Sequence, residues 1–261
     1  GFALLFCAMI AQAGGDHMPY FRFFAPLVPL LALLLYPAGL LLVGRKEKLL
    51  RDLAVACMDH HDRTVRNLNS KRIQCDEIWA FCYAKRATVK RRQSIAEKHP
   101  EAGDVWTWTA LDADSKLIVS YRVGDRGLGT AHEFMGDLVS RLRNRVQLTT
   151  DAHQPYRSAV PDNFAEVDYA TLHKIYSQKV NEPNRYSPPL VIGVRAAVVS
   201  GRPDPDHIST SYVERANLTI RMSIRRFTRL TNAFSKKIEN HVAMVALYFM
   251  FYNFGRVHQT L

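Results

Sequence analysis

The alternation of apolar and polar positions predicts four strands in the middle of the chain. Residues 72–83 are apolar and aromatic around an acidic centre, a pattern typical of a buried strand. Residues 105–111 and 116–123 predict two more strands, joined at 112–115 by a stretch with the composition of a turn. Residues 146–150 predict a fourth strand, which ends immediately before an aspartate.

Four stretches have the apolar spacing of helices. One covers residues 46–66, and a second begins at Thr130, where Glu133 completes the spacing of a capping box and Thr130 is the expected N-cap. A third covers 211–230, and a fourth, 237–252, is apolar nearly all round and is expected to be buried or to lie against a partner. Strands followed by helices in this order predict a mixed α/β domain with a central sheet.

Two segments give no clear helix or strand signal. Residues 155–208 are rich in proline and aspartate and support no assignment. Residues 85–98 are strongly basic and are expected to form a loop or an exposed turn; they include Arg86, Lys90, Arg91 and Arg92.

The beginning of the chain is unusually apolar. Residues 23–43 carry no charge and are long enough to cross a bilayer, and Arg45, Lys46 and Lys48 follow as a positive flank. The chain also starts at Gly1 instead of a methionine. Two interpretations stay open: a membrane segment, or a non-native start created by truncation or fusion.

Composition indicates a polyanionic partner. Lysine and arginine total 35 against 24 acidic residues, a net charge of +11, which favours nucleic acid or an anionic membrane surface. The four cysteines form no CxxC pair, so a zinc site and a disulfide framework are not expected. Reduced, buried thiols in a cytoplasmic protein are the simplest interpretation, with membrane association as the alternative if residues 23–43 form a span.

Three acidic residues occupy positions that suggest chemistry. Asp76 lies inside an apolar strand, where a buried charge is costly unless it is paired or bound to metal. Asp151 follows a strand, and Glu214 begins a helix. Each has a plain alternative: Asp76 pairing with Arg72, Asp151 as an ordinary turn residue, and Glu214 complementing the helix dipole.

Converging carboxylates suit phosphoryl transfer assisted by two metal ions. Mg²⁺, or Mn²⁺ in its place, prefers carboxylate oxygens and keeps waters and substrate phosphates as its other ligands. Two such ions, roughly 3.5–4 Å apart, activate the attacking oxygen and stabilise the leaving one. The predicted catalytic and metal-binding residues are Asp76, Asp151 and Glu214.

The region around Glu214 is basic. From residue 210 to the end there are eight lysines and arginines against two glutamates, which favours contact with a DNA phosphate backbone. A solvated basic surface stays open as the alternative for Arg229, Lys236 and Lys237, less so for Arg221. The predicted DNA-binding residues are Arg215, Asn217, Arg221, Arg225, Arg226, Arg229 and Lys236.

Three motifs together resemble the transposases of bacterial insertion sequences, in the family typified by insertion sequence 1. They are CDEIW at 75–79, TTDAHQPY at 149–156 and SYVERANL at 211–218, and the stretches 225–236 and 252–261 are also similar. The resemblance covers about residues 47–261. It implies a DDE transposase of α/β class, in which a ribonuclease-H-like mixed sheet is flanked by helices. The apolar N-terminal segment precedes this fold.

The resemblance also implies roles and partners. It assigns Asp76, Asp151 and Glu214 to two Mg²⁺ or Mn²⁺ ions and places Arg221 near bound DNA. The implied partners are double-stranded DNA, as transposon ends and target, and further copies of the chain. The expected organisation is an apolar segment at 1–44, a helical remnant of a DNA-binding region at 45–70 and a catalytic domain at 71–261.

Two other functions stay open. The transposases that it resembles begin with a helix-turn-helix region that recognises the ends of the element, and we expect only the last helix of such a region in this sequence. The chain could therefore be a catalytically idle DNA-binding remnant, tethered to a membrane if residues 23–43 span it. A ribonuclease-H-like nuclease without strand transfer shares the three carboxylates but does not need the surroundings of Arg221.

Overall fold

The computed structural model describes residues 43–176, 191–227 and 232–256. These residues divide into two compact units. Unit 1 holds helix α4 (Val43–Thr64) as far as His61 and helix α10 (Ile238–Phe254) from Glu239 onward, and unit 2 holds the chain between them. Apart from Val43, the predicted apolar span lies outside the described residues. No helix among the described residues is long and apolar enough to cross a membrane.

The two helices of unit 1 confirm the first and last helices predicted from the sequence. In α4, Leu53, Ala54 and Cys57 are buried, as the apolar spacing requires. The His60 ring packs edge-on against Phe254 of α10, with ring centroids 5.0 Å apart. The expected domain boundaries at residues 44 and 70 stay predictions.

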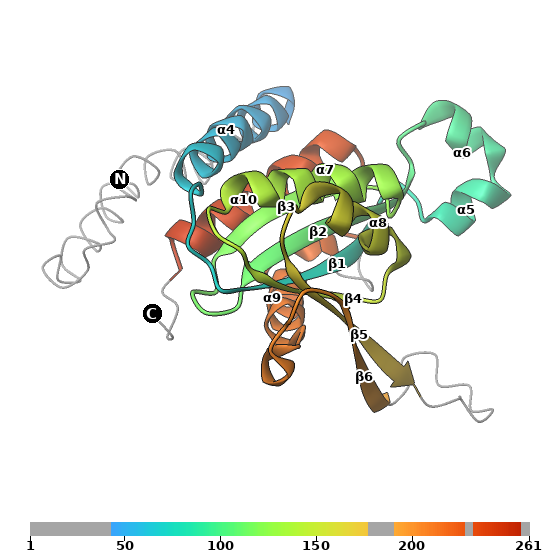
Figure 1. The fold of residues 1–261 in the computed structure, drawn as a ribbon. Helices are drawn as coiled ribbons and strands as arrows, with labels where there is room; N and C mark the ends of the chain where they lie inside the picture. The colour runs from blue at the N-terminus through green and yellow to red at the C-terminus, as the bar shows by residue number, and fades with distance from the viewer. Residues whose placement is uncertain (1–42, 177–190, 228–231, 257–261) are drawn as a thin grey trace, which may run out of the picture. The chain divides into compact units, whose positions relative to one another are not determined.

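Unit 2 is built on a six-stranded mixed sheet (Figure 1). The strand order is β3-β2-β1-β4-β5-β6. Strands β1, β2 and β3 pair antiparallel, β4 and β5 run parallel to β1, and β6 returns antiparallel to β5. The strands are β1 (Arg72–Cys82), β2 (Gly103–Asp112), β3 (Ile118–Gly124), β4 (Gln147–Asp151), β5 (Asp168–Tyr176) and β6 (Val191–Ser200).

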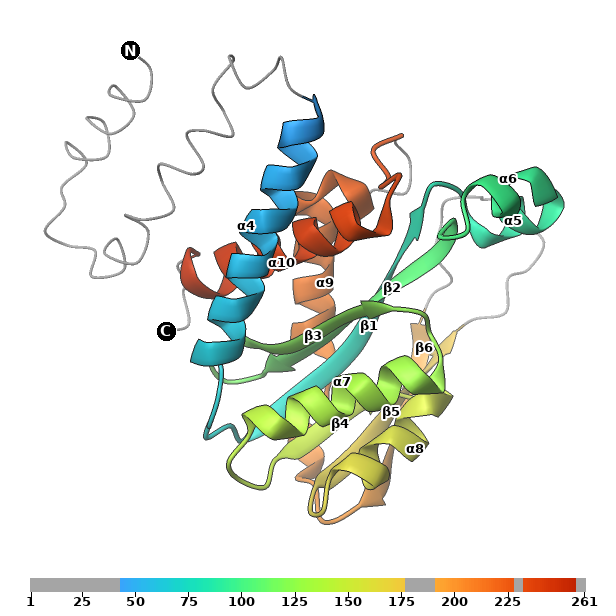
Figure 2. The same cartoon turned by 90° about the horizontal axis from the view of Figure 1, so that it is seen from above.

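Helices cover both faces of this sheet. Helices α7 (Leu128–Arg141) and α8 (Gln154–Asn163) lie side by side on one face, and α9 (Ser211–Ser223) lies on the other (Figures 1 and 2). The core between the sheet and the α7–α8 layer consists of apolar and aromatic side chains, because these two amphipathic helices turn their apolar faces to the strands. Among its fully buried members are Trp108, Phe134, Leu138, Leu148 and Tyr156.

The basic segment predicted as a loop is helical instead. It forms two six-residue helices, α5 (Arg86–Arg91) and α6 (Gln93–Lys98), beyond the far ends of β1 and β2 (Figure 2). Neither helix has a buried residue, so the sequence contains no apolar stripe from which these helices could be predicted.

Two other expectations were wrong in detail, and the structure assigns the segment 155–208 that the sequence left unassigned. Helix α7 begins at Leu128 with Gly127 as its N-cap, and the Thr130 hydroxyl donates to Asp125. The segment 155–208 contains most of α8, strands β5 and β6, and the short 3-10 helix η2 (Pro205–His207). Helix α9 ends at Ser223, and a 3-10 turn, η3 (Arg225–Phe227), follows.

A matched pair of substitutions tests the position of the core. Leu148 is fully buried in β4, whereas Leu218 on α9 is 47% exposed. We expect Leu148→Ala to lower the free energy of unfolding by about 2–5 kcal/mol, because it leaves a cavity, and Leu218→Ala by less than about 1 kcal/mol. Urea denaturation followed by tryptophan fluorescence measures both, since all three tryptophans lie in β1 and β2. Equal losses would contradict the described packing.

Candidate metal centre

Strand β1 presents its polar side chains alternately to the two faces of the sheet. Gln74 and Asp76 face α9, because each forms hydrogen bonds with that helix. The intervening Cys75 belongs to the core under α7 and α8. Glu77 points to the same side as Cys75, as the two-residue period of a strand requires. One short stretch of sequence therefore supplies acidic groups to both faces.

Asp76 and Asp151 lie side by side on parallel strands. Cys75 pairs with Thr150 in the register of β1 and β4, so the next residue of each strand is one of these aspartates. Asp151 ends β4, and its Oδ1 accepts a hydrogen bond from the amide of His153 at 3.0 Å, which fixes the turn into α8. Functional groups at the carboxyl ends of parallel strands are accessible there, beyond the end of the sheet.

Glu77 is the third carboxylate at this edge. Its side chain is fully buried, and Oε2 accepts hydrogen bonds from Arg126 Nε at 3.2 Å and Nη2 at 3.1 Å. Arg126 Nη2 also lies 3.6 Å from Asp151 Oδ2. Asp76, Glu77 and Asp151 each offer an oxygen within 4.8 Å of the other two, so their negative charges repel one another strongly.

Two polar contacts dock α9 onto β1. Gln74 Oε1 accepts hydrogen bonds from the backbone amides of Tyr212 at 2.9 Å and Val213 at 3.1 Å, satisfying donors that the first helical turn leaves without partners. One turn further on, Asn217 Nδ2 donates to Asp76 Oδ2 at 2.8 Å. Residues 74 and 76 of the strand thus fix the height and rotation of the helix.

Glu214 lies on the face of α9 that this docking turns toward Asp76, because it precedes Asn217 by three positions. Its charge contributes to raising the pKa of Asp76, behind larger effects of burial and of Asp151. The Glu214 carboxylate forms an ion pair with Lys174 of β5 and accepts a hydrogen bond from the Thr210 hydroxyl. Lysine thus neutralises the third predicted ligand.

The carboxyl groups of half-buried Asp76 and buried Glu77 hold protons more tightly than usual. Burial, reinforced by the charge of Asp151, raises the pKa of Asp76 to about 6, although the hydrogen bond from Asn217 opposes the rise. Burial and Asp151 likewise raise the pKa of Glu77 to about 8. The Tyr156 hydroxyl and Arg126 oppose this second rise, although Tyr156 forms no hydrogen bond of normal geometry with Glu77.

The structure brings two of the three predicted ligands into one cluster and adds a residue that sequence reasoning missed. Asp76 and Asp151 belong to the cluster, and Glu77 completes it. Glu214 lies near Asp76 but outside this tight group, paired with Lys174. The signal for Glu77 was its place beside Asp76 in a buried strand, where its own charge also needs compensation.

The residues predicted to bind DNA differ in exposure. Arg215, Arg225 and Lys236 are exposed, and Arg221 is half-buried. Asn217 is buried and bonded to Asp76, so its observed contact is with the carboxylate cluster. Arg226 donates to the Ser235 hydroxyl at 2.8 Å, and Arg229 lies outside the described residues.

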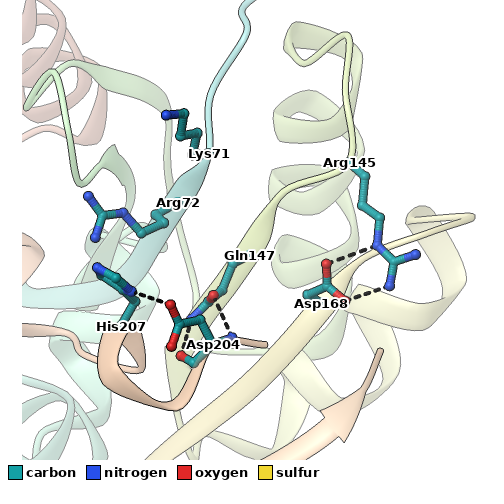
Figure 3. A pocket seen from close by; sticks show the side chains of 7 residues that line it. All are labelled: Lys71, Arg72, Arg145, Gln147, Asp168, Asp204 and His207. Atoms are coloured by element: carbon teal, nitrogen blue, oxygen red, sulfur yellow. Dashed lines mark hydrogen bonds and ion pairs between the residues drawn. The ribbon is translucent and has the colours of Figure 1, made fainter. Parts of the chain in front are cut away.

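A hollow of about 520 Å³ lies at the opposite end of the parallel strands, around the first residues of β1, β4 and β5. Figure 3 shows two pairs among its charged groups, Asp204 with His207 and Asp168 with Arg145. Both acidic groups of its walls are therefore compensated, unlike the clustered carboxylates around Asp76. The lining residues are Lys71, Arg72, Arg145, Gln147, Asp168, Asp204 and His207.

Comparison with known proteins does not assign the chain to a family. Neither a scan against protein-family models nor a search of the curated proteins found a match for the chain. The functional assignment therefore depends on the chemistry and placement of the side chains.

The raised pKa values predict how the metal-free protein responds to pH. Protons bound more tightly in the folded state stabilise it at low pH, and this contribution is lost as the pH rises through about 6 for Asp76 and about 8 for Glu77. In EDTA, we expect the free energy of unfolding of the wild type to fall between pH 5 and pH 9 by at least about 1 kcal/mol more than that of Glu77→Gln. This difference corresponds to about one pKa unit. Urea denaturation across that range measures it.

The variant is the matched control, because glutamine keeps an acceptor for Arg126 and cannot ionise. Histidine titrations affect both proteins and cancel in the difference. Parallel stability curves for the two proteins above pH 6 would contradict the assignment of a raised pKa to Glu77.

Proposed function

We propose that this chain is a metal-dependent DNA transposase with a ribonuclease-H-like catalytic domain. The observation that carries the proposal is the docking of α9 on β1, which directs the face bearing Glu214 to the strand pair bearing Asp76 and Asp151. The strand order, with β1, β4 and β5 parallel and β2 and β3 antiparallel, is compatible with a ribonuclease-H-like fold.

The residues present fit a hard divalent cation. Their donors are carboxylate oxygens, which Mg²⁺ and Mn²⁺ prefer, and the pKa values of Asp76 and Glu77 are raised by burial and mutual repulsion that a cation would relieve. Among the described residues, the buried oxygens Glu77 Oε1 and Asn217 Oδ1 have no hydrogen-bond partner. Asp76, Asp151 and Glu214 would hold the two ions, with Glu77 beside them.

When bound, the ions would polarise a DNA phosphate and lower the pKa of an attacking hydroxyl group. The chain's own residues have positioning tasks. Gln74 and Asn217 keep α9 in register with β1, and Arg126 restrains Glu77 and Asp151. Arg215 and Arg225 remain exposed for contact with phosphates. Assembly of several copies on paired DNA ends is part of the proposal.

Substitution of each ligand tests this function. With Mn²⁺, we expect the full chain to nick supercoiled plasmid and to join an oligonucleotide bearing a free 3′-hydroxyl to it. Asp76→Asn, Asp151→Asn and Glu214→Gln should each slow both reactions by at least about 100-fold, because every change removes a charged ligand from the transition state. Gel analysis of nicked and joined products gives the rates.

Glu133→Gln is the matched control, because Glu133 is an exposed acid in a surface ion pair with Arg122 and should retain full activity. Full activity of Glu214→Gln would remove Glu214 from the site and leave Glu77 as the third ligand. Nicking without joining would indicate a nuclease, and complete inactivity of the wild type with all metals would support the idle remnant.

Lys174 provides a test that does not need catalysis. Because its ammonium group pairs with Glu214, it competes with a cation for that carboxylate. We expect Lys174→Met to bind Mn²⁺ about 2- to 5-fold more tightly, the effect of a partly exposed ion pair. Mn²⁺ titration followed by electron paramagnetic resonance measures the affinity. Lys71→Met, which removes a lysine at the opposite edge of the sheet, should leave it unchanged; equal effects would contradict a local competition.

A further inference from the structure

The insertion between β1 and β2, residues 85–98, is the most basic short segment that the proposed site does not use. We call it the basic arm. It contains six lysines and arginines and a single acidic residue, Glu97. All six basic side chains are exposed, and among the described residues none of them forms an ion pair. They are Lys85, Arg86, Lys90, Arg91, Arg92 and Lys98.

The base of the arm is firmly attached to the sheet. The Tyr83 ring stacks on His99 with ring centroids 3.7 Å apart, so the two ends of the insertion meet. Asp104 of β2 accepts a hydrogen bond from the Arg86 amide at 3.0 Å, at the first turn of α5. The arm is therefore held in place although it buries no side chain of its own.

A row of aromatic and cationic side chains connects the arm to the carboxylates. Trp79 and Trp106 are directly opposite each other on β1 and β2 and share one face. Lys85 lies 5.7 Å from the Trp79 ring centroid, and Arg126 lies 4.5 Å from that of Trp106. Arg126 in turn contacts Glu77, so the row ends at the metal centre.

The electrostatic influence of Arg86 on Asp125 agrees with this placement of the base of the arm. The pKa of Asp125, the residue before Arg126, is lowered by hydrogen bonds from Thr130 and Gly127 and by the nearby charge of Arg86. The arm and the carboxylates thus share one end of the sheet. The base of the arm, with Lys85 and Arg86, therefore lies on the carboxylate side of the sheet.

We propose that the basic arm binds the phosphate backbone of duplex DNA whose scissile phosphate lies at the carboxylate cluster. This inference rests on the proposed function and names a DNA contact outside α9. Several exposed cations that form no ion pair within the described residues suit contact with a phosphate backbone. An anionic membrane is the less favoured partner, because α5 and α6 carry only Val89 and Ile95 as larger apolar residues to insert into lipid.

The test neutralises three arm charges and compares them with three equally exposed charges elsewhere. The arm variant is Lys90→Gln, Arg91→Gln and Arg92→Gln in the full chain. The control variant is Lys71→Gln, Arg143→Gln and Arg202→Gln, at the opposite edge of the sheet. Fluorescence anisotropy with a labelled duplex, in EDTA to prevent cleavage, gives Kd from 50 to 200 mM salt. Circular dichroism verifies that both variants fold.

We expect the arm variant to bind at least about 10-fold more weakly at 100 mM salt and to lower the slope of log Kd against log salt by about 2 to 3, roughly 0.9 per lost phosphate contact. The control should change Kd less than about 2-fold. An unchanged slope, or equal weakening in the control, would overturn the proposal. Loss of flotation with phosphatidylserine vesicles but not of DNA binding would overturn it in favour of a membrane contact.

Failure of this inference is distinguishable from failure of the proposed function. If the wild type nicks DNA with Mn²⁺ and the arm variant nicks it equally well at every salt concentration, DNA binding by the arm is refuted and the proposed function is supported. Arm-dependent DNA binding without metal-dependent nicking or joining would support the arm and refute the transposase.

Discussion

The contact between strand β1 and helix α9 is the constraint on which the candidate site depends. Gln74 satisfies two amides of the helix start, and Asp76 accepts the hydrogen bond of Asn217 one turn later. Both strand residues are two positions apart and face the same side of the sheet, so they act as a pair of fixed points. The buried apolar side chains of α9 hold the helix against the sheet, and these polar contacts set the position of Glu214 relative to the strand carboxylates.

Around this contact, the metal centre concentrates negative charge in a partly buried place. Such charge is destabilising by itself, and the raised pKa values of Asp76 and Glu77 express that cost. The protein compensates locally: Arg126 contacts Glu77 and Asp151, and Lys174 pairs with Glu214. A strained electrostatic arrangement of this kind is typical of sites that bind cations or perform acid–base chemistry.

The same edge of the sheet carries the basic arm and the two paired tryptophans. Their arrangement gives the proposed DNA substrate two different surfaces: exposed arginines on α9 and η3, and the cations that extend from Arg126 to the arm. At the opposite end of the strands, the two acidic side chains of the hollow are each paired with a basic one (Figure 3). Charge is therefore distributed unequally between the ends of the sheet, and only one end combines clustered carboxylates with unpaired cations among the described residues.

Sequence periodicity by itself determined the first four strands, helices α4 and α10 and the positions of Asp76 and Asp151 at strand sites, because neighbours along the chain set those patterns. It missed α5 and α6, which have no buried face, and the antiparallel strands β5 and β6, of which β6 is exposed along most of its length. Only the tertiary structure decided that Glu77 joins the carboxylates and that Asn217, 141 positions after Asp76, holds α9 in place. Such contacts arise from the pairing of distant segments, and no local pattern encodes the register in which those segments meet.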